Sequence, residues 1–396
     1  MHEAPKTRLS RRQWLSACTL ASGAVLCGFE RLPGPRIATV GQEDGFPGGK
    51  KLGVVAFAGE APVPMEKVFG AGLDGRMYTD LSKLNLRGSI TPTEKFYIRT
   101  CASELLEGQK AWVVRVSGLV ARPFELGIED LKKTAKPMGA HLMECAGNAR
   151  SVHFGLMSAA DWTGVALSEI LEIAKTKAQT ARALISGFDS YTAKSISSVP
   201  GASWVFTLEE LKSSKAFLAT EMNGSPLTKD HGAPVRLIVP GWYGCACIKW
   251  VNEIRLVDDG AEATSQMQEF AARTQQRGVP RLARDFEPAI MDQAAMPVRI
   301  EKWLVDGHIQ YRVAGILWGG SQVVKALEIR FNPDEDYVAV DSFPQRDNDP
   351  WSFWTHAWTP KQPGTYMIRL RIKEPQVVAR RLDAGYYLRT VEITEV

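Results

Sequence analysis

The sequence predicts an α+β fold in which a mixed domain is followed by a β-sandwich. At 396 residues the chain is too long for one compact core, so two domains are expected. Residues 95–260 mix helix and strand patterns. From about residue 295 the pattern changes to short alternating runs broken by Gly, Pro, Asn and Asp, as in immunoglobulin-like sandwiches. We therefore expect a mixed domain over residues 50–262 and a sandwich over residues 285–396.

The elements of the mixed domain follow from periodicity and turn residues. Residues 110–120 (KAWVVRVSGLV) alternate and predict a strand that ends in a Gly turn. Residues 165–177 place apolar side chains three and four apart, which predicts an amphipathic helix. Thr207, with Glu210 three residues later, has the spacing of a capping box at the start of another helix. Residues 233–244 predict a strand that runs into a Pro-Gly turn.

The last hundred residues contain six or seven strand patterns. We expect the four tryptophans of this region to anchor its core and interfaces, because large aromatic side chains dominate such packing: Trp318, Trp351, Trp354 and Trp358. Residues 262–278 are polar and irregular, and we interpret them as a connector that passes near the site of the first domain.

The N-terminus has the features of an export signal. Arg11 and Arg12 precede a weakly apolar run from Ser16 to Phe29, which indicates a twin-arginine signal peptide and leader over residues 1–40. The run is shorter than the roughly 20 apolar residues that span a membrane. We expect a periplasmic protein whose mature form has no membrane span; an ordinary surface amphipathic helix is the alternative. Because this pathway exports folded proteins, it favours a cofactor inserted in the cytoplasm.

The charge balance gives no support to nucleic-acid binding. The chain has 48 basic and 44 acidic side chains, and residues 1–36 contain six of the basic and two of the acidic ones. The remainder therefore has 42 of each sign, and its near neutrality lacks the basic excess typical of nucleic-acid partners.

The cysteines leave two possibilities open. Six are present, at positions 18, 27, 101, 145, 245 and 247. They form no C-x-x-C-H motif, so we expect no haem on this chain. They also form no C-x-x-C pair of the kind that binds zinc or an iron–sulfur cluster. In an oxidising compartment the last four could form two disulfides, or at least one could bind a metal. For the C-x-C pair Cys245 and Cys247, packing of small side chains is the expectation and a metal pair is the alternative.

The segment ECAGNAR, residues 144–150, is the strongest candidate for chemistry. Gly147 lets the backbone approach a ligand closely, and Asn148 is a hydrogen-bonding turn residue. Arg150 supplies a cation that suits an oxyanion and favours a thiolate at Cys145. A soft thiolate beside an anion-binding arginine indicates a metal oxo-transfer site. A buried structural cysteine is the alternative.

Residues 228–250 form a second candidate cluster, in which His231, Arg236 and Lys249 interrupt an apolar strand-turn-strand. Cationic and neutral donors on glycine-rich turns suit a phosphate or another polyanionic ligand. For His231 alone, a satisfied core or turn histidine is an equal alternative. Arg99 ends a β-run at residues 94–103, where a surface arginine is the alternative.

Together the segments ECAGNAR, EMNGSPLTKDHGAPVRLIVPG and IKW resemble the sulfite oxidase family of molybdenum-cofactor enzymes, and bacterial sulfite dehydrogenases in particular. The resemblance runs from about residue 90 to the C-terminus. It implies a molybdopterin-binding domain followed by a sandwich domain that forms a homodimer.

The resemblance also implies a role for each matching position. Cys145 matches the thiolate that ligates molybdenum beside the pterin dithiolene, and Arg99 and Arg150 match arginines of the oxyanion pocket. The implied cofactor contacts are Asp189, His231, Arg236, Cys247, Ile248 and Lys249, the last three at the phosphate end.

The chain departs from the family pattern in two places. Thr100 and Cys101 stand where the family usually has Asn-His. The active-site tyrosine of the family should fall within 262–278, which contains no tyrosine, and Met267 or Phe270 occupies its neighbourhood. These departures bear on the substrate, because a phenol there would stabilise a bound oxyanion.

Two further side chains are candidates for entering the same pocket. Tyr243 could approach from the Pro-Gly turn, and Arg389 could approach from the sandwich domain.

The predicted activity is two-electron oxygen-atom transfer, with sulfite as the expected oxyanion substrate and a c-type cytochrome as the expected electron acceptor. One alternative is the same cofactor acting in reverse on an S-oxide or another oxo-substrate. A second is a cysteine hydrolase that pairs Cys145 with His231. A third is a non-catalytic adhesion or binding module built on the sandwich.

Overall fold

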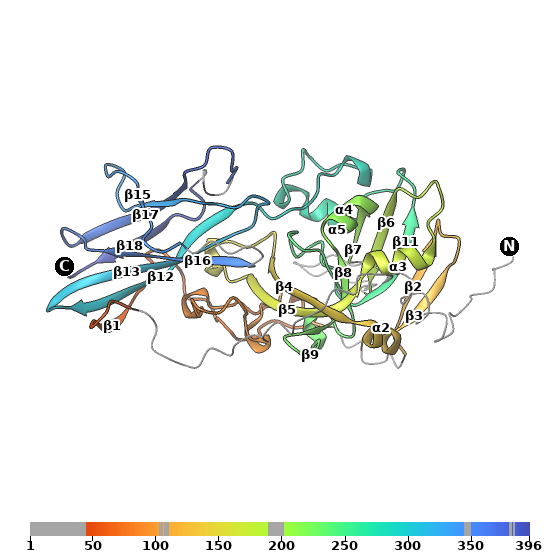
Figure 1. The fold of residues 1–396 in the computed structure, drawn as a ribbon, viewed down its shortest axis with the longest axis horizontal. Coiled ribbons are helices and arrows are strands. Elements are labelled where there is room, and N and C mark those ends of the chain that lie inside the picture. Colours follow the sequence, from red (N-terminus) through yellow and green to blue (C-terminus); the bar gives the residue numbers. More distant parts are fainter. Residues whose placement is uncertain are drawn as a thin grey trace, which may run out of the picture.

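The computed structural model describes residues 45–102, 106, 111–188, 202–343, 350–379, 382 and 385–396. The described chain has a mixed half at one end and a β-rich half at the other (Figure 1). This arrangement confirms the predicted fold class. Within the described residues, no helix combines the length and apolar character that a membrane crossing requires.

The mixed half contains two five-stranded sheets. In the first, β8 also pairs with the short β9, and the strand order is β10 (Arg236–Ile238), β8 (Phe217–Met222), β5 (Met157–Ala166) and β4 (Lys136–Glu144), with β9 at Ser225–Pro226. In the second, the order is β3 (Phe124–Gly127), β2 (Val113–Gly118), β11 (Val251–Val257), β6 (Arg182–Gly187) and β7 (Ser203–Thr207). Only the β11–β2 pair of these two sheets is parallel.

Four short helices accompany these sheets in the described chain: α2 (Ile128–Thr134), α3 (Leu167–Ala174), α4 (Leu208–Ser213) and α5 (Ser265–Phe270). The predicted capping box is present, because the Glu210 N–H donates to Thr207 Oγ1 at 3.0 Å and the Thr207 N–H donates to Glu210 Oε2 at 2.7 Å. The predicted amphipathic helix is α3, which buries Leu167, Ile170 and Ile173.

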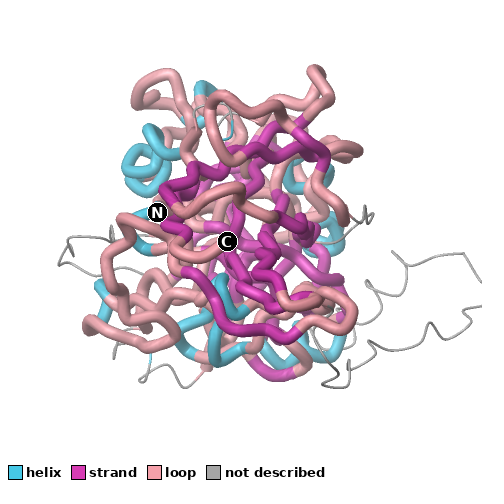
Figure 2. The backbone as a smooth tube through the Cα atoms, turned by 90° about the vertical axis from the view of Figure 1, so that its left-hand side faces the viewer, coloured by secondary structure: helices cyan, strands magenta, loops and turns pink. Residues whose placement is uncertain are grey.

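The β-rich half is a sandwich of two four-stranded sheets. One has the order β1 (Lys50–Val55), β12 (Ala294–Val305), β13 (His308–Trp318) and β16 (Trp351–Trp358). The other has the order β15 (Val338–Ala339), β14 (Leu327–Arg330), β17 (Gly364–Ile372) and β18 (Arg389–Ile393). Side chains from both sheets share one apolar core, which includes Ile300, Val313, Ile329, Ile368 and Val391. Figure 2 shows the molecule from this end, with strands dominating the centre.

The tryptophans of this half are buried, as the sequence predicts. Trp318, Trp351, Trp354 and Trp358 are all at most 8% exposed. Trp318 and Trp351 belong to the core cluster of the mixed half, whereas Trp354 and Trp358 belong to the core of the sandwich. The tryptophans therefore serve both the sandwich core and the contact between the halves.

The structure differs from the predicted domain boundary at residue 50. Strand β1 pairs antiparallel with β12, so residues 50–55 belong to a sheet of the sandwich. The chain then crosses to the mixed half, where Met77 and Ile98 form an isolated bridge. Because β1 and β12 are separated by more than 230 residues, periodicity within either segment does not show that they pair.

Candidate active site

The candidate site begins where β4 ends. Glu144 is the last residue of that strand, and Cys145 follows it in a tight turn. The Cys145 N–H donates to Leu156 O at 2.9 Å, and its carbonyl accepts from the Asn148 N–H at 2.9 Å. The Gly147 N–H donates to Cys145 Sγ at 3.4 Å. The turn therefore holds the sulfur with a backbone dipole directed at it.

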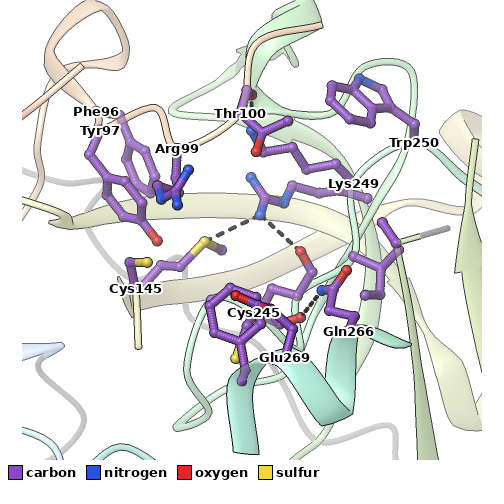
Figure 3. Close-up of a pocket in the computed structure, with 17 residues that line it drawn as sticks. Phe96, Tyr97, Arg99, Thr100, Cys145, Cys245, Lys249, Trp250, Gln266 and Glu269 are labelled. Atoms are coloured by element: carbon purple, nitrogen blue, oxygen red, sulfur yellow. Dashed lines mark hydrogen bonds between the residues drawn. The ribbon is translucent and has the colours of Figure 1, made fainter. Parts of the chain in front are cut away.

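Cys145 lines a cleft of about 860 Å³, counted with its open mouth (Figure 3). Aromatic rings, cations and small apolar groups make its walls, and Glu269 is the one carboxylate among the described lining residues. The residues that line it are Phe96, Tyr97, Arg99, Thr100, Met143, Cys145, Ala202, Arg236, Gly244, Cys245, Cys247, Ile248, Lys249, Trp250, Gln266, Glu269 and Phe270.

Two arginines of this cleft have buried nitrogen atoms without a hydrogen-bond partner among the described residues: Arg99 Nη1 and Arg236 Nε. Arg236 is 2% exposed and donates to His231 O at 2.9 Å, Cys247 O at 3.2 Å and Met143 Sδ at 3.2 Å. Burial lowers the pKa of Arg99, and the Cys145 sulfur opposes this shift. A buried cationic N–H group without a partner is costly, so the cleft is suited to an anionic ligand.

Lys249 extends from the segment after β10 to the same cleft. Its Nζ donates to Thr100 O at 2.7 Å and to Asp230 O at 2.6 Å. Burial, with the neighbouring Arg236 contributing, lowers the pKa of Lys249 to about 7. A nearby anion would favour the protonated form, as expected for a lysine that binds phosphate.

The structure places His231 behind the cleft wall. Its Nδ1 is 2.8 Å from Thr228 Oγ1, and its Nε2 is 3.1 Å from Phe96 O. Burial lowers the pKa of His231 to about 4, with Lys249 contributing, so the ring is neutral. Both ring nitrogens therefore hold protein groups, and the neutral ring supports the Arg99 segment from the side of Phe96.

The alternative of a cysteine hydrolase that pairs Cys145 with His231 is not supported, because the pair is not formed. Because both nitrogens of His231 are bonded elsewhere, no general base from this residue faces the sulfur. Burial raises the pKa of the Cys145 thiol, although Arg99 opposes the shift. All four described cysteines are free, so the structure also excludes disulfides among Cys101, Cys145, Cys245 and Cys247.

The prediction that Arg150 lines the anion pocket with Arg99 is not supported by the geometry. The Arg150 side chain is exposed, and its Nη2 donates to Leu388 O at 2.7 Å and to Tyr386 O at 3.3 Å. It lies outside the set of residues that line the cleft. The turn that precedes β18 supplies these carbonyls, and a sequence motif around Cys145 cannot show that they bind the guanidinium.

The other expected residues have mixed outcomes. Cys247 and Ile248 line the cleft with Lys249. Asp189 lies outside the described residues. Tyr243 faces Asp292, with its hydroxyl 3.2 Å from Oδ2, and Arg389 pairs with Glu60 at 2.7 Å. Neither of these two lines the cleft.

The connector at 262–278 does pass by the site, as predicted, but part of it is helical. Helix α5 presents Gln266, Glu269 and Phe270 to the cleft, and Gln266 Nε2 donates to Cys245 O at 2.5 Å. Met267 is buried in the core instead. The connector therefore places an aromatic ring at the cleft wall without a phenolic hydroxyl.

Sequence reasoning missed Tyr97 and Arg273. Tyr97 lies across the cleft from α5, with its hydroxyl directed toward Cys145 (Figure 3). Burial raises its pKa well above the ordinary value, so the phenol stays protonated. Its position two residues before Arg99, in the strand alternation of residues 94–99, was the available signal. Arg273 follows α5 by one turn, and a cation in a connector expected near the site could have identified it.

Comparisons with known proteins agree with this geometry. The family model described as "Oxidoreductase molybdopterin binding domain" matches residues 102–265. The nitrate reductase [NADPH] of Mycosarcoma maydis is 32% identical over 213 residues, covering 45% of this chain and 21% of that protein. The mitochondrial sulfite oxidase of Homo sapiens is 24% identical over 285 residues, covering 66% of this chain and 50% of that protein.

A solved structure shares the whole fold. The sulfane dehydrogenase SoxCD from Paracoccus pantotrophus aligns with a TM-score of 0.63 and 17% identity, covering 96% of this chain and 99% of that one. Residues 102–265 therefore form a molybdopterin-binding oxidoreductase domain. The chain is similar to sulfite oxidases and nitrate reductases. It spans between 21% and 50% of the length of the two curated relatives named above.

The cleft fits the molybdopterin cofactor that the matched domain implies. A thiol faces it from Cys145, and a thiolate is a preferred ligand for a soft metal centre. Arg236 and Lys249 supply cations for an anionic phosphate end, and Arg236 Nε is buried without a partner among the described residues. No group of three or more His, Cys, Asp or Glu that could hold a metal occurs within the described ranges.

Proposed function

We propose that this chain oxidises sulfite to sulfate by oxygen-atom transfer, using a molybdenum–molybdopterin cofactor held through Cys145. The observation that carries the proposal is the position of Arg99. Its guanidinium has a buried nitrogen without a partner among the described residues, and its pKa responds to the sulfur of Cys145. A metal ligand and an unpaired cation in one cleft suit the positioning of an oxyanion beside a redox centre.

The residues that would hold the cofactor follow from the lining of the cleft. Cys145 would ligate molybdenum, and Arg236 would contact the pterin portion. The segment 247–249 would contact the phosphate end, with Lys249 as its cation. When bound, the cofactor supplies the two-electron redox change and the transferred oxygen atom. Asp189 stays a proposed contact on family resemblance alone.

The protein would contribute positioning and charge. Arg99 would bind the sulfite oxygens and leave the sulfur lone pair facing the reactive centre. The Tyr97 hydroxyl would donate a hydrogen bond into the cleft, and Phe270 would exclude water from its wall. Over a full cycle, sulfite and water would give sulfate, two protons and two electrons. Fixed donors of this kind lower the barrier because they need no reorganisation during the reaction.

We propose that the electrons leave to a separate c-type cytochrome; the sequence itself contains no C-x-x-C-H motif for haem attachment. We propose that the twin-arginine signal exports the protein to the periplasm, as the residues Arg11 and Arg12 indicate. We also propose that the sandwich forms a homodimer, as the family resemblance implies.

One specific observation favours a second candidate, the reduction of an oxo-substrate such as an S-oxide. The connector that lines the cleft contributes Phe270 and no tyrosine, and nitrate reductases are among the relatives. A cleft without that phenol would stabilise bound sulfite less, and this change would favour substrates with weaker charge.

A substrate panel on the protein purified from the periplasm tests the proposal. Sulfite-dependent reduction of cytochrome c, with molybdenum present in the protein, is the expected result. Oxidation of a reduced dye by S-oxides or nitrate, without sulfite-dependent cytochrome reduction, would favour the second candidate. Absence of molybdenum and pterin from the folded protein would contradict both.

A further inference from the structure

The turn that carries Cys145 contributes no arginine to the cleft, because Arg150 lies outside the lining. Its guanidinium is held by the carbonyls of Tyr386 and Leu388, which leaves Arg99 without a second guanidinium from the Cys145 turn. Two arginines bind an oxyanion in a defined orientation better than one, because each provides a planar pair of donors. The question is which other cation faces the sulfur.

Arg273 meets this requirement by position. A methyl group placed on Gly147 would lie 3.5 Å from Arg273 Nη1 and 3.8 Å from Cys145 Sγ. Arg273 and the Cys145 sulfur therefore face the same small space, which Gly147 leaves open by having no side chain.

The Arg273 guanidinium is also free to bind a ligand. Among the described residues, no hydrogen bond or ion pair engages it; the contact made by its guanidinium carbon is with the ring of Phe270, 5.4 Å from the centroid. Arg273 is exposed and is not itself a lining residue of the cleft, whereas Phe270 is, so this contact holds the cation at the cleft edge. Arg99 Nη1, the other donor, is buried and has no hydrogen-bond partner among the described residues.

We propose that Arg273 is the second guanidinium of the oxyanion site, opposite Arg99, in the role that the sequence suggested for Arg150. The ligand class is a small oxyanion of sulfur or of similar shape and charge. The inference deepens the proposed function, on which its assignment to the substrate rests. The connector thus contributes a cation to the site in place of the tyrosine that it lacks.

Sulfate binding to the full-length holoprotein tests the inference without turnover. Titration calorimetry at low ionic strength would compare the wild type with Arg273→Gln, Arg273→Lys and Arg150→Gln. Arg277→Gln, in the same connector, is the matched control for loss of an exposed arginine. We expect Arg273→Gln to weaken sulfate binding by about ten- to a hundredfold, as for loss of a charge-assisted hydrogen bond.

The other variants sharpen the result. Arg273→Lys should recover part of the affinity, and the Arg150 and Arg277 variants should stay within about twofold of the wild type, as expected for surface charges. Equal molybdenum content and equal thermal unfolding would show that Arg273→Gln is folded and loaded. Sulfate binding that is undetectable in the wild type, unchanged in Arg273→Gln, or weakened more by Arg150→Gln would overturn the inference.

Steady-state kinetics separate this inference from the proposed substrate. If sulfite is oxidised, Arg273→Gln should raise KM far more than it lowers kcat, because binding in the ground state is lost. If sulfite is not oxidised but sulfate binding still depends on Arg273, the substrate proposal fails and the anion site remains.

Discussion

Lys249 is a buried lysine, and its surroundings differ from those of a surface lysine. Its ammonium group is enclosed between the carbonyls of Thr100 and Asp230 and close to Arg236. Burial lowers its pKa to about 7, so its charge is only partly retained at neutral pH. A phosphate group in the cleft would restore the charge, and this coupling accounts for a buried lysine at this position.

Replacing Lys249 gives a prediction with a defined pH window. In the unfolded chain its pKa is about 10.5, so between pH 7 and 10.5 the unfolded state binds a proton that the folded state does not. The free energy of unfolding of the cofactor-free wild type should therefore rise with pH across this window, relative to Lys249→Met. Urea unfolding at several pH values between 6.5 and 9.5 measures the difference.

The control for this experiment is Lys132→Met, which removes an exposed lysine from α2. Its difference from the wild type should vary less with pH than that of Lys249→Met. A constant difference between the wild type and Lys249→Met across the window would show that Lys249 is not deprotonated by burial.

At the residue scale, the sequence predicted which residue types belong to the site better than it predicted the orientation of each side chain. The residue types and the motif order around Cys145, Arg99, Arg236 and Lys249 were sufficient to place these side chains at one cleft. They were not sufficient for Arg150, because its partners are backbone carbonyls of a turn more than 230 residues away. Backbone acceptors carry no sequence signal, so motif spacing could not reveal them.

Helix α5 lies in the connector that the sequence predicted as irregular, and its helical structure was not predicted. It is six residues long and shows no full amphipathic period, since only Met267 is buried. Its start is fixed by Thr264, whose Oγ1 accepts from the Met267 N–H at 3.2 Å and donates to Ser203 O at 2.6 Å. Tertiary contacts and one cap, rather than propensity, therefore form the helix.

Thr264→Ala should destabilise the protein by about 1 kcal/mol, or up to about 2 because the bond to Ser203 is also lost. It should also raise the KM for the oxyanion, because α5 carries Phe270 and precedes Arg273. Thr207→Ala removes a similar cap from α4, away from the cleft, and should lower stability by a similar amount with KM unchanged. Urea unfolding and steady-state kinetics measure both effects.

A Thr264→Ala protein with unchanged KM would show that the placement of α5 does not matter for binding. The capping box of α4, by contrast, was readable from sequence, because Thr207 and Glu210 satisfy each other locally. A capping box is recognisable in a sequence because both of its residues lie within one helical turn. The bond from Thr264 to the distant Ser203 carbonyl is not recognisable in this way.

The two halves of the molecule are joined beside the site by Glu144. Its buried carboxylate accepts from Trp318 Nε1 at 2.9 Å, from the Tyr387 hydroxyl at 3.4 Å and from Asn148 Nδ2 at 3.3 Å. Trp318 comes from a sandwich strand, and Glu144 directly precedes Cys145. The Tyr386 hydroxyl also donates to Asn148 O at 2.8 Å. The sandwich therefore positions the turn that carries the sulfur.

Trp318→Phe removes one donor to this buried carboxylate and should cost about 1.5–3 kcal/mol from that bond alone. Trp354→Phe is the matched control, because its indole N–H donates to the neutral carbonyl of Ile316 at 3.2 Å and lies far from Cys145 in the chain. We expect Trp318→Phe to be less stable than the control by about 1 kcal/mol and to bind molybdenum less completely. Thermal unfolding and metal analysis of both variants would show the difference.

Equal stability and equal metal content in the two tryptophan variants would contradict a positioning role for the sandwich. The sequence predicted the sandwich and its buried tryptophans, but not this link. Whether Trp318 packs within the sandwich or against the mixed half depends on the docking of the halves, which no local pattern specifies.

X-ray absorption at the molybdenum edge, on the wild type and on Cys145→Ser, tests the central claim that the sulfur of Cys145 binds the metal. We expect molybdenum and pterin in both proteins, one fewer sulfur neighbour around the metal in the variant, and loss of oxidase activity. An unchanged sulfur count in Cys145→Ser, or folded wild-type protein without molybdenum, would contradict the account.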